Sequence, residues 1–213
     1  MRWSWIGDNL DDIWEATVEH LWLTGIAMVV GFAIAMVLSV LAIRYRRLYG
    51  PITATTGVIF TIPSFALFFV LAPFTGLTVL TAEIGLVLYT LLVLVRNTVA
   101  GLDGVPEDVK EAARGMGYTR NRLFLEIELP LALPVIIAGL RIATVTTVGL
   151  VTITALITFG GLGRFILDGL QQNLFVPKLV VGAVGPTVLA LVLDGALLLV
   201  QRALTPWSRR AAA

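Results

Sequence analysis

The sequence predicts an all-α integral membrane protein with five transmembrane helices. Its 213 residues have a mean hydropathy of +0.93, and 58% of them are hydrophobic. Only 14% are charged, against roughly 25% in soluble globular domains. The apolar residues fall into five long segments, each of about the length that crosses a bilayer. We therefore expect residues 1–213 to form a single transmembrane domain with no separate soluble part.

The first two predicted spans differ in what they contain. Span 21–43 has no charged residue, and at ~1.5 Å per residue it covers the roughly 30 Å hydrocarbon core. His20, at its entrance, is expected at the membrane interface. Span 52–72 contains Pro63, which deletes a backbone hydrogen bond in mid-helix. Because lipid cannot satisfy the freed carbonyl, we expect a kink at Pro63 that faces protein or a transport pathway.

A polar segment divides the remaining spans. The third span, 77–95, leads into residues 101–130, which hold four of the fifteen basic and six of the fourteen acidic residues. We call this segment the polar loop. The fourth and fifth spans, 135–159 and 179–200, follow it. A segment so charged cannot lie in lipid, and structureless loops of this length are uncommon unless they are functional.

The distribution of lysine and arginine predicts the orientation. Five spans place the two chain ends on opposite sides, and basic residues in short loops collect in the cytoplasm. Eleven basic residues fall on one side: Arg44, Arg46, Arg47, Arg96, Lys110, Arg114, Arg120, Arg122, Arg202, Arg209 and Arg210. Three fall on the other: Arg2, Arg164 and Lys178. We therefore expect the N-terminus outside, and the polar loop and C-terminus in the cytoplasm.

The polar loop carries the signals of two short helices. Pro106 suits the first position of a helix, and the two acidic residues after it favour the positive end of the helix dipole. Gly117 tolerates a left-handed exit and is expected to end this helix. Thr119 can cap a second helix, which we expect to end before Pro130.

One spacing in the polar loop is specific. The residues are Glu111, Ala112 and Ala113, then Gly117, then Ile127, Leu129 and Pro130. This pattern resembles the signature loop of permease subunits of binding-protein-dependent, type I ABC importers, and the spacing departs from it nowhere. The resemblance implies the five-span fold of that family. It also implies that Glu111, Ala112, Ala113 and Gly117 belong to coupling helices inserted into a groove of a separate ATPase, with Pro130 positioning them.

Other stretches point to a substrate class. EHLWL at 19–23, TIPSFALF at 61–68 and GGLGRFILDGL at 160–170 resemble the osmoprotectant branch, which imports glycine betaine, carnitine and choline. The small five-span size also resembles methionine importer permeases, so an amino-acid importer is the alternative. A stand-alone secondary transporter would need inverted repeats or several intramembrane ionisable groups, and the sequence offers few.

The resemblance also implies partners and a location. It predicts two copies of a cytoplasmic ATP-binding subunit, a second permease subunit (identical or homologous) and an extracytoplasmic substrate-binding protein, in a bacterial-type cell membrane. The chain contains no G-x-x-x-x-G-K-[ST] phosphate loop, so ATP is expected on the partner and the chain is not expected to be an enzyme. With one histidine and no cysteine, we expect no catalytic set, metal or cofactor. Membrane lipid is an expected partner and nucleic acid is not.

Two charged residues fall inside predicted spans. Arg141 lies in the fourth span and Asp194 in the fifth, both toward the cytoplasmic half at similar depths. An isolated charge within a membrane costs at least a few kcal/mol. We therefore hypothesise that Arg141 and Asp194 form an intramembrane pair, the alternative being that each reaches backbone carbonyls or a watery interface separately.

Overall fold

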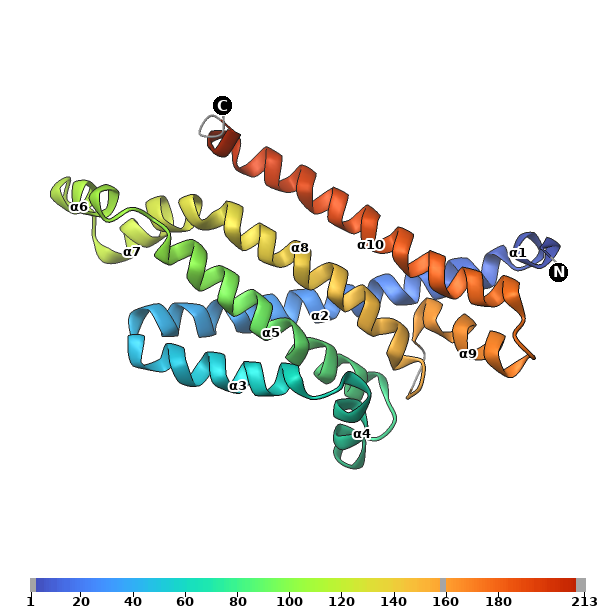
Figure 1. Cartoon of the computed structure of the whole chain (residues 1–213). Helices are drawn as coiled ribbons and strands as arrows, with labels where there is room; N and C mark the ends of the chain where they lie inside the picture. The colour runs from blue at the N-terminus through green and yellow to red at the C-terminus, as the bar shows by residue number, and fades with distance from the viewer. Residues whose placement is uncertain (1–2, 158–159, 210–213) are drawn as a thin grey trace.

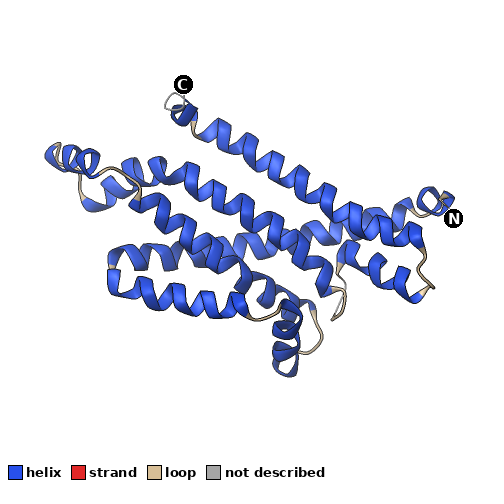
Figure 2. Ribbon diagram, in the orientation of Figure 1, coloured by secondary structure: helices blue, strands red, loops and turns tan. Residues whose placement is uncertain are grey.

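The computed structural model describes residues 3–157 and 160–209, and every regular element in these ranges is helical (Figures 1 and 2). The α-helices are α1 (Ser4–Asp8), α2 (Leu10–Arg44), α3 (Tyr49–Thr61), α4 (Ser64–Thr75), α5 (Val79–Asp103), α6 (Glu107–Gly115), α7 (Arg120–Leu123), α8 (Leu129–Thr154), α9 (Arg164–Gln171) and α10 (Val176–Leu204). Short 3₁₀ segments are η1 (Arg46–Leu48), η3 (Gly161–Gly163) and η4 (Pro206–Arg209), and η2 (Phe124–Glu128) is a π-helix.

Four helices in the described part of the chain are long and apolar enough to cross a membrane, and a bent pair makes a fifth candidate. The four correspond to α2, α5, α8 with the short helical stretch before it, and α10. The second predicted span, 52–72, is not one helix, because α3 and α4 meet at an angle of 99°. The all-helical prediction is thus confirmed, with one span broken in the middle.

The boundaries of the other spans shift by a few residues or more. Helix α2 begins eleven residues before the predicted 21–43, since its amphipathic first turns continue the same helix. Helix α5 runs through Asp103 and so includes the first residues of the polar loop. Helix α8 covers Leu129–Thr154 in place of 135–159, and residues 158 and 159 lie outside the described part.

Helix α5 occupies the centre of the bundle, between α2 and α8 (Figure 1). Small residues let these helices approach closely, as is common in membranes. A Cβ built on Gly31 of α2 would lie 2.1 Å from Oγ1 of Thr90, and one on Gly139 of α8 would lie 2.4 Å from Cβ of Asn97. At both contacts any side chain larger than that of glycine would clash, so the two glycines fix the register of α2, α5 and α8.

The end of the bundle that holds the N-terminus is closed by α1, η3 and α9 (Figure 1). Trp5 of α1 makes edge contacts with Phe165 and Phe175, with ring centroids 5.9 and 5.8 Å apart. The Lys178 ammonium lies 5.5 Å from the Trp5 ring centroid. The polar loop lies at the opposite end, so the N-terminus and the polar loop are separated by the length of the bundle.

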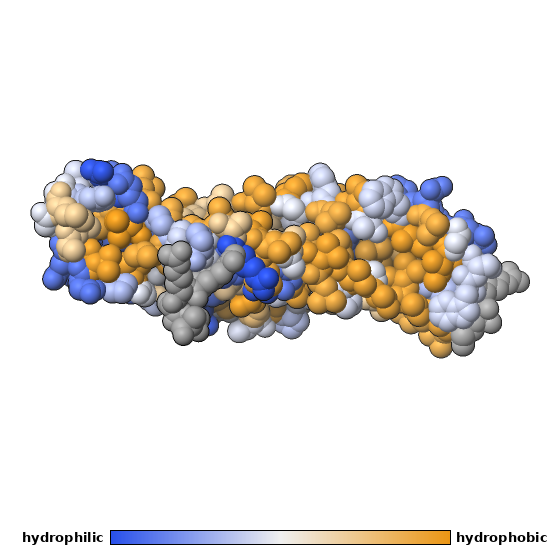
Figure 3. Space-filling model, turned by 90° about the horizontal axis from the view of Figure 1, so that it is seen from above, coloured by the Kyte–Doolittle hydropathy of each residue, from blue (hydrophilic) through white to orange (hydrophobic). Residues whose placement is uncertain are grey.

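Much of the outer surface is apolar. Figure 3 shows hydrophobic residues over most of the middle of one face, with hydrophilic residues toward its two ends and in one patch between them. On α10 the exposed large side chains include Val188, Leu191 and Leu199, which are 51%, 68% and 65% exposed. An apolar surface of this extent needs lipid or another apolar chain against it.

Candidate functional site

Helix α6 presents the residues of the signature spacing on two faces. Ala113 is buried against the rest of the chain, whereas Glu111 and Ala112 are exposed. Glu107 in the first turn accepts a hydrogen bond from Arg114 at 2.8 Å and lies 3.4 Å from the Lys110 ammonium. The Arg114 hydrogen bond holds the pKa of Glu107 below its usual value. These pairs rigidify the helix and leave its small exposed face free for close approach.

Gly117 ends α6 in a Schellman motif. The Tyr118 N–H donates to the Ala113 carbonyl at 3.1 Å, and the Gly117 N–H donates to the Arg114 carbonyl at 2.9 Å. This pair of bonds defines the motif and satisfies carbonyls that the helix end would leave open. Gly117 has φ +83°, a conformation that costs most other residues about 1–2 kcal/mol. The prediction that the helix ends in a left-handed residue at Gly117 is therefore confirmed.

The sequence predicted that the second short helix ends before Pro130, but in the structure it continues. Thr119 caps it by accepting a hydrogen bond from the Arg122 N–H at 3.4 Å. The helix then passes through the π-helical turn η2 directly into α8. Pro130 lacks an N–H, and its ring clashes with the carbonyl four residues earlier. A wider π turn before Pro130 accommodates both, so α7, η2 and α8 form one continuous helical path.

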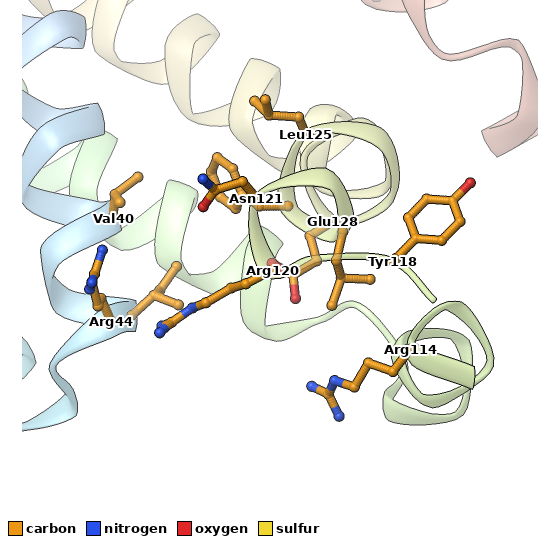
Figure 4. Close-up of a pocket in the computed structure, with 11 residues that line it drawn as sticks. Val40, Arg44, Arg114, Tyr118, Arg120, Asn121, Leu125 and Glu128 are labelled. Carbon is orange, nitrogen blue, oxygen red and sulfur yellow. The ribbon is translucent and has the colours of Figure 1, made fainter. Parts of the chain in front are cut away.

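A groove of about 690 Å³ opens between the polar loop and the end of α2. It is lined by Val40, Ile43, Arg44, Arg114, Tyr118, Arg120, Asn121, Leu123, Phe124, Leu125 and Glu128. Figure 4 shows Arg44, Arg114 and Arg120 extending toward its open side from three different helices. The groove thus has an apolar floor and a basic rim, which suits an inserted element that carries acidic side chains.

The polar loop is anchored to the bundle by an ion pair and an apolar cluster. Arg46 donates two hydrogen bonds to the Asp103 carboxylate, at 2.7 and 2.6 Å. This contact joins the turn after α2 to the end of α5. Leu102, Ala132 and Ile136 are buried together beneath the loop. Movement of the loop is therefore passed to α5 and α8 rather than absorbed locally.

Pro63 lies at the break between α3 and α4. The preceding residue, Ile62, is extended at ψ 129°, as steric contact with a following proline requires. The Tyr89 hydroxyl of α5 donates a hydrogen bond to the Ile62 carbonyl. The structure thus satisfies the carbonyl at the break from a neighbouring helix. No pattern in the sequence identifies Tyr89 as the donor.

Arg141 and Asp194 face each other across α8 and α10. Nε and one terminal nitrogen of Arg141 each donate to a different oxygen of Asp194, both at 2.8 Å. The side chains are 27% and 30% exposed. Arg141 lies near the middle of α8 rather than toward the end that joins the polar loop, because α8 starts six residues earlier than the predicted span.

His20 has a different environment from the expected interface. It is fully buried, and its Nε2 lies 3.0 Å from the Val148 carbonyl. Its Nδ1 accepts a hydrogen bond from the Leu162 N–H at 3.3 Å. His20 therefore ties α2 to α8 and η3. No group of three or more His, Cys, Asp or Glu residues in the described ranges could hold a metal ion.

Comparisons with known proteins agree on one family. Residues 27–210 match the family described as "Binding-protein-dependent transport system inner membrane component". The chain is 38% identical over 204 residues to the osmoprotectant import permease protein OsmW of Salmonella typhimurium, covering 93% of this chain and 94% of the relative. It is 37% identical over 199 residues to the choline transport system permease protein OpuBB of Bacillus subtilis, covering 93% and 91%.

Solved structures share the fold. A chain of the inward-facing MetNI methionine ABC transporter superposes with a TM-score of 0.74 at 23% identity, covering 92% of this chain and 95% of that one. A chain of an amino acid ABC transporter crystallised with histidines gives a TM-score of 0.78 at 17% identity, covering 95% and 98%. Identities this low show a common fold and say nothing of the substrate.

Proposed function

The chain belongs to the binding-protein-dependent transport system inner membrane component family, and from this premise we propose how it works and what it carries. The family places it in a bacterial membrane as a multi-pass permease subunit of an ABC importer. Such permeases act with an ATPase and a substrate-binding protein. Our proposal is that this subunit couples to two ATPase copies through the polar loop and, with a second permease, imports quaternary-ammonium osmoprotectants.

The observation that carries the coupling role is the geometry of the polar loop. Helix α6 is held by its Schellman turn and ion pairs, with Glu111 and Ala112 exposed. The groove beside it has a basic rim, which suits an acidic element of the partner. Residues 120–154 form one helical stretch of 35 residues, about 52 Å at 1.5 Å per residue. A shift of the docked loop would therefore move the whole of α8, as alternating access between two packings requires.

Charge supports the proposed orientation. The Arg46 turn and the polar loop lie at the end of the bundle opposite the N-terminus (Figure 1). The excess of basic residues in these short loops favours the cytoplasm for that end. In this arrangement the N-terminus, α1 and α9 lie outside, where a substrate-binding protein docks, and the C-terminus is cytoplasmic.

The substrate class is supported by the relatives. They are named as osmoprotectant and choline permeases at 37–38% identity, whereas the methionine likeness rests on the fold alone. Uptake by the assembled complex in proteoliposomes, with glycine betaine, choline, carnitine and methionine in competition, tests this choice. Competition by methionine alone would favour the amino-acid alternative, and uptake without ATP would favour a stand-alone transporter.

Co-purification with the ATPase tests the coupling role directly. Ala112→Arg places a long cation on the exposed face of α6 and is expected to abolish co-purification and transport while membrane insertion continues. Gln171→Arg places the same side chain at the exposed end of α9, on the opposite end of the bundle, and is the matched control for co-purification with the ATPase. Retained ATPase binding by Ala112→Arg would refute docking through α6.

A further inference from the structure

The Arg141–Asp194 pair lies deep between the two ends of the bundle. Arg141 is twelve residues after the start of α8 at Leu129 and thirteen before its end at Thr154. At 1.5 Å per residue the backbone of Arg141 is about 18 Å along the axis from one helix end and about 20 Å from the other. The two side chains are 27% and 30% exposed at this depth.

Neither lipid nor stability accounts for the pair. Charged side chains at membrane depth almost always face protein or a water-filled cavity rather than acyl chains. Replacing an ion pair in a low-dielectric setting by apolar residues is often neutral or stabilising. The pair is therefore weak evidence for a structural role, and both side chains remain partly accessible at the surface of this chain.

Two hollows on the same face flank the pair. One has a volume of about 470 Å³ and lies between α8, α9 and α10; the other has a volume of about 460 Å³ beside Arg141. Val145 and Asp194 line both. Each volume falls in the range of roughly 300–1,000 Å³ typical of small-molecule sites. The described residues that line them include no aromatic side chain, so a cation would find its partner in Asp194 rather than in a ring.

We propose that Arg141 and Asp194 form a low-affinity acceptor site for a zwitterionic substrate halfway along the permease. The inference rests on the proposed transport of osmoprotectants and adds the residues that would receive the substrate and the charge pattern they select. The salt bridge opens, the substrate's carboxylate binds the Arg141 guanidinium, and its cationic group approaches Asp194. No covalent bond changes.

The exchange of charges predicts which substrates the site would select. A betaine replaces each partner of the pair by a group of the same sign, so no unpaired charge remains at membrane depth. The planar guanidinium binds a carboxylate through two parallel hydrogen bonds. Choline carries the cation without the carboxylate, so it would leave Arg141 unpaired. The site is therefore expected to favour glycine betaine over choline.

Direct ligand binding to the purified permease–ATPase complex, without the binding protein, tests the site. The probe is glycine betaine, with choline at equal concentration, and the readout is the saturable part of the rise in thermal unfolding temperature. The neutral double variant Arg141→Gln/Asp194→Asn removes both charges and keeps amides that can bond to each other. The matched control Asp168→Asn/Lys178→Gln neutralises the ion pair between α9 and α10, which lies outside the polar loop and does not line either hollow.

The expected result is a saturable betaine shift in the wild type and in the control. In the neutral variant the apparent affinity for betaine should be at least tenfold weaker. Choline should give less than a tenth of the betaine affinity. An equal response to both ligands in the wild type, or an undiminished betaine response in the neutral variant, would overturn the proposal. If the neutral variant does not fold, Arg141→Lys decides, because it keeps the charge beside Asp194 and loses the two parallel hydrogen bonds to a carboxylate. Its apparent betaine affinity should fall below that of the wild type, and an undiminished response would overturn the proposal.

Failure of this test leaves the proposed function standing, because uptake by the full complex is measured separately. A complex that carries osmoprotectants yet shows no betaine-specific shift would refute only the acceptor site. A complex that carries none of them would refute the proposed function itself.

Discussion

Substitution of Gly117 is the sharpest test of how the polar loop is built. Gly117 has φ +83°, and no atom lies within 4 Å of a Cβ built there. Gly117→Ala therefore meets backbone strain and no steric clash. The strain is about 1–2 kcal/mol, equivalent to a factor of roughly 5–30 in an equilibrium constant. If the ATPase binds only the loop with its Schellman turn intact, its apparent affinity should fall by up to that factor.

Two matched variants separate strain from size. Gly115→Ala adds the same methyl group two residues earlier, where φ is negative and no atom lies within 4 Å; it should stabilise α6 by about 0.5–1 kcal/mol. Gly117→Asn adds a larger side chain that tolerates the left-handed region. The assay is titration of the purified permease with the ATPase, followed by substrate-stimulated ATP hydrolysis. Affinity should decrease in the order Gly, Asn, Ala at position 117, and an Asn variant weaker than the Ala variant would refute the reasoning.

Three further substitutions probe the bundle. Tyr89→Phe removes the donor to the open carbonyl at the α3–α4 break and should destabilise the permease by about 0.6–1.7 kcal/mol, measured by thermal unfolding in detergent; an unchanged midpoint would show that the carbonyl has another partner. Thr119→Ala removes the cap of α7, worth about 1 kcal/mol, and should speed hydrogen exchange of the α7 amides while leaving α5 unchanged. Gly139→Ala forces a methyl group against Asn97 and should lower the free energy of unfolding by about 1–3 kcal/mol. Gly149 lies on the same helix, and no atom lies within 4 Å of a Cβ built there, so Gly149→Ala should lower the unfolding midpoint little.

The sequence anticipated the elements that depend on local chemistry. The left-handed Gly117, the Thr119 cap and the break at Pro63 each follow from what one residue can or cannot do with its backbone. The class of fold followed from apolar length, because a bilayer requires a fixed number of residues per helix.

The sequence missed what depends on distant contacts. His20 reads as an interfacial residue, but the carbonyl of Val148 and the amide of Leu162 satisfy it within the bundle. Continuity through Pro130 was missed because a π turn, which has no sequence signature of its own, accommodates the proline. The bidentate contact of Arg141 with Asp194 was a hypothesis from depth alone, and its geometry depends on how α8 and α10 cross.

One helical path joins the two proposed roles. Arg120, on the rim of the groove, and Arg141 belong to the same stretch of residues 120–154, about 32 Å apart along the axis at 1.5 Å per residue. Asp194 belongs to α10, a separate helix that is not part of the stretch 120–154. A displacement of the loop by the ATPase would therefore move Arg141 relative to Asp194 and bias the salt bridge toward opening or closing. The π turn between them, a feature often found at functional sites, accommodates Pro130 without interrupting this path.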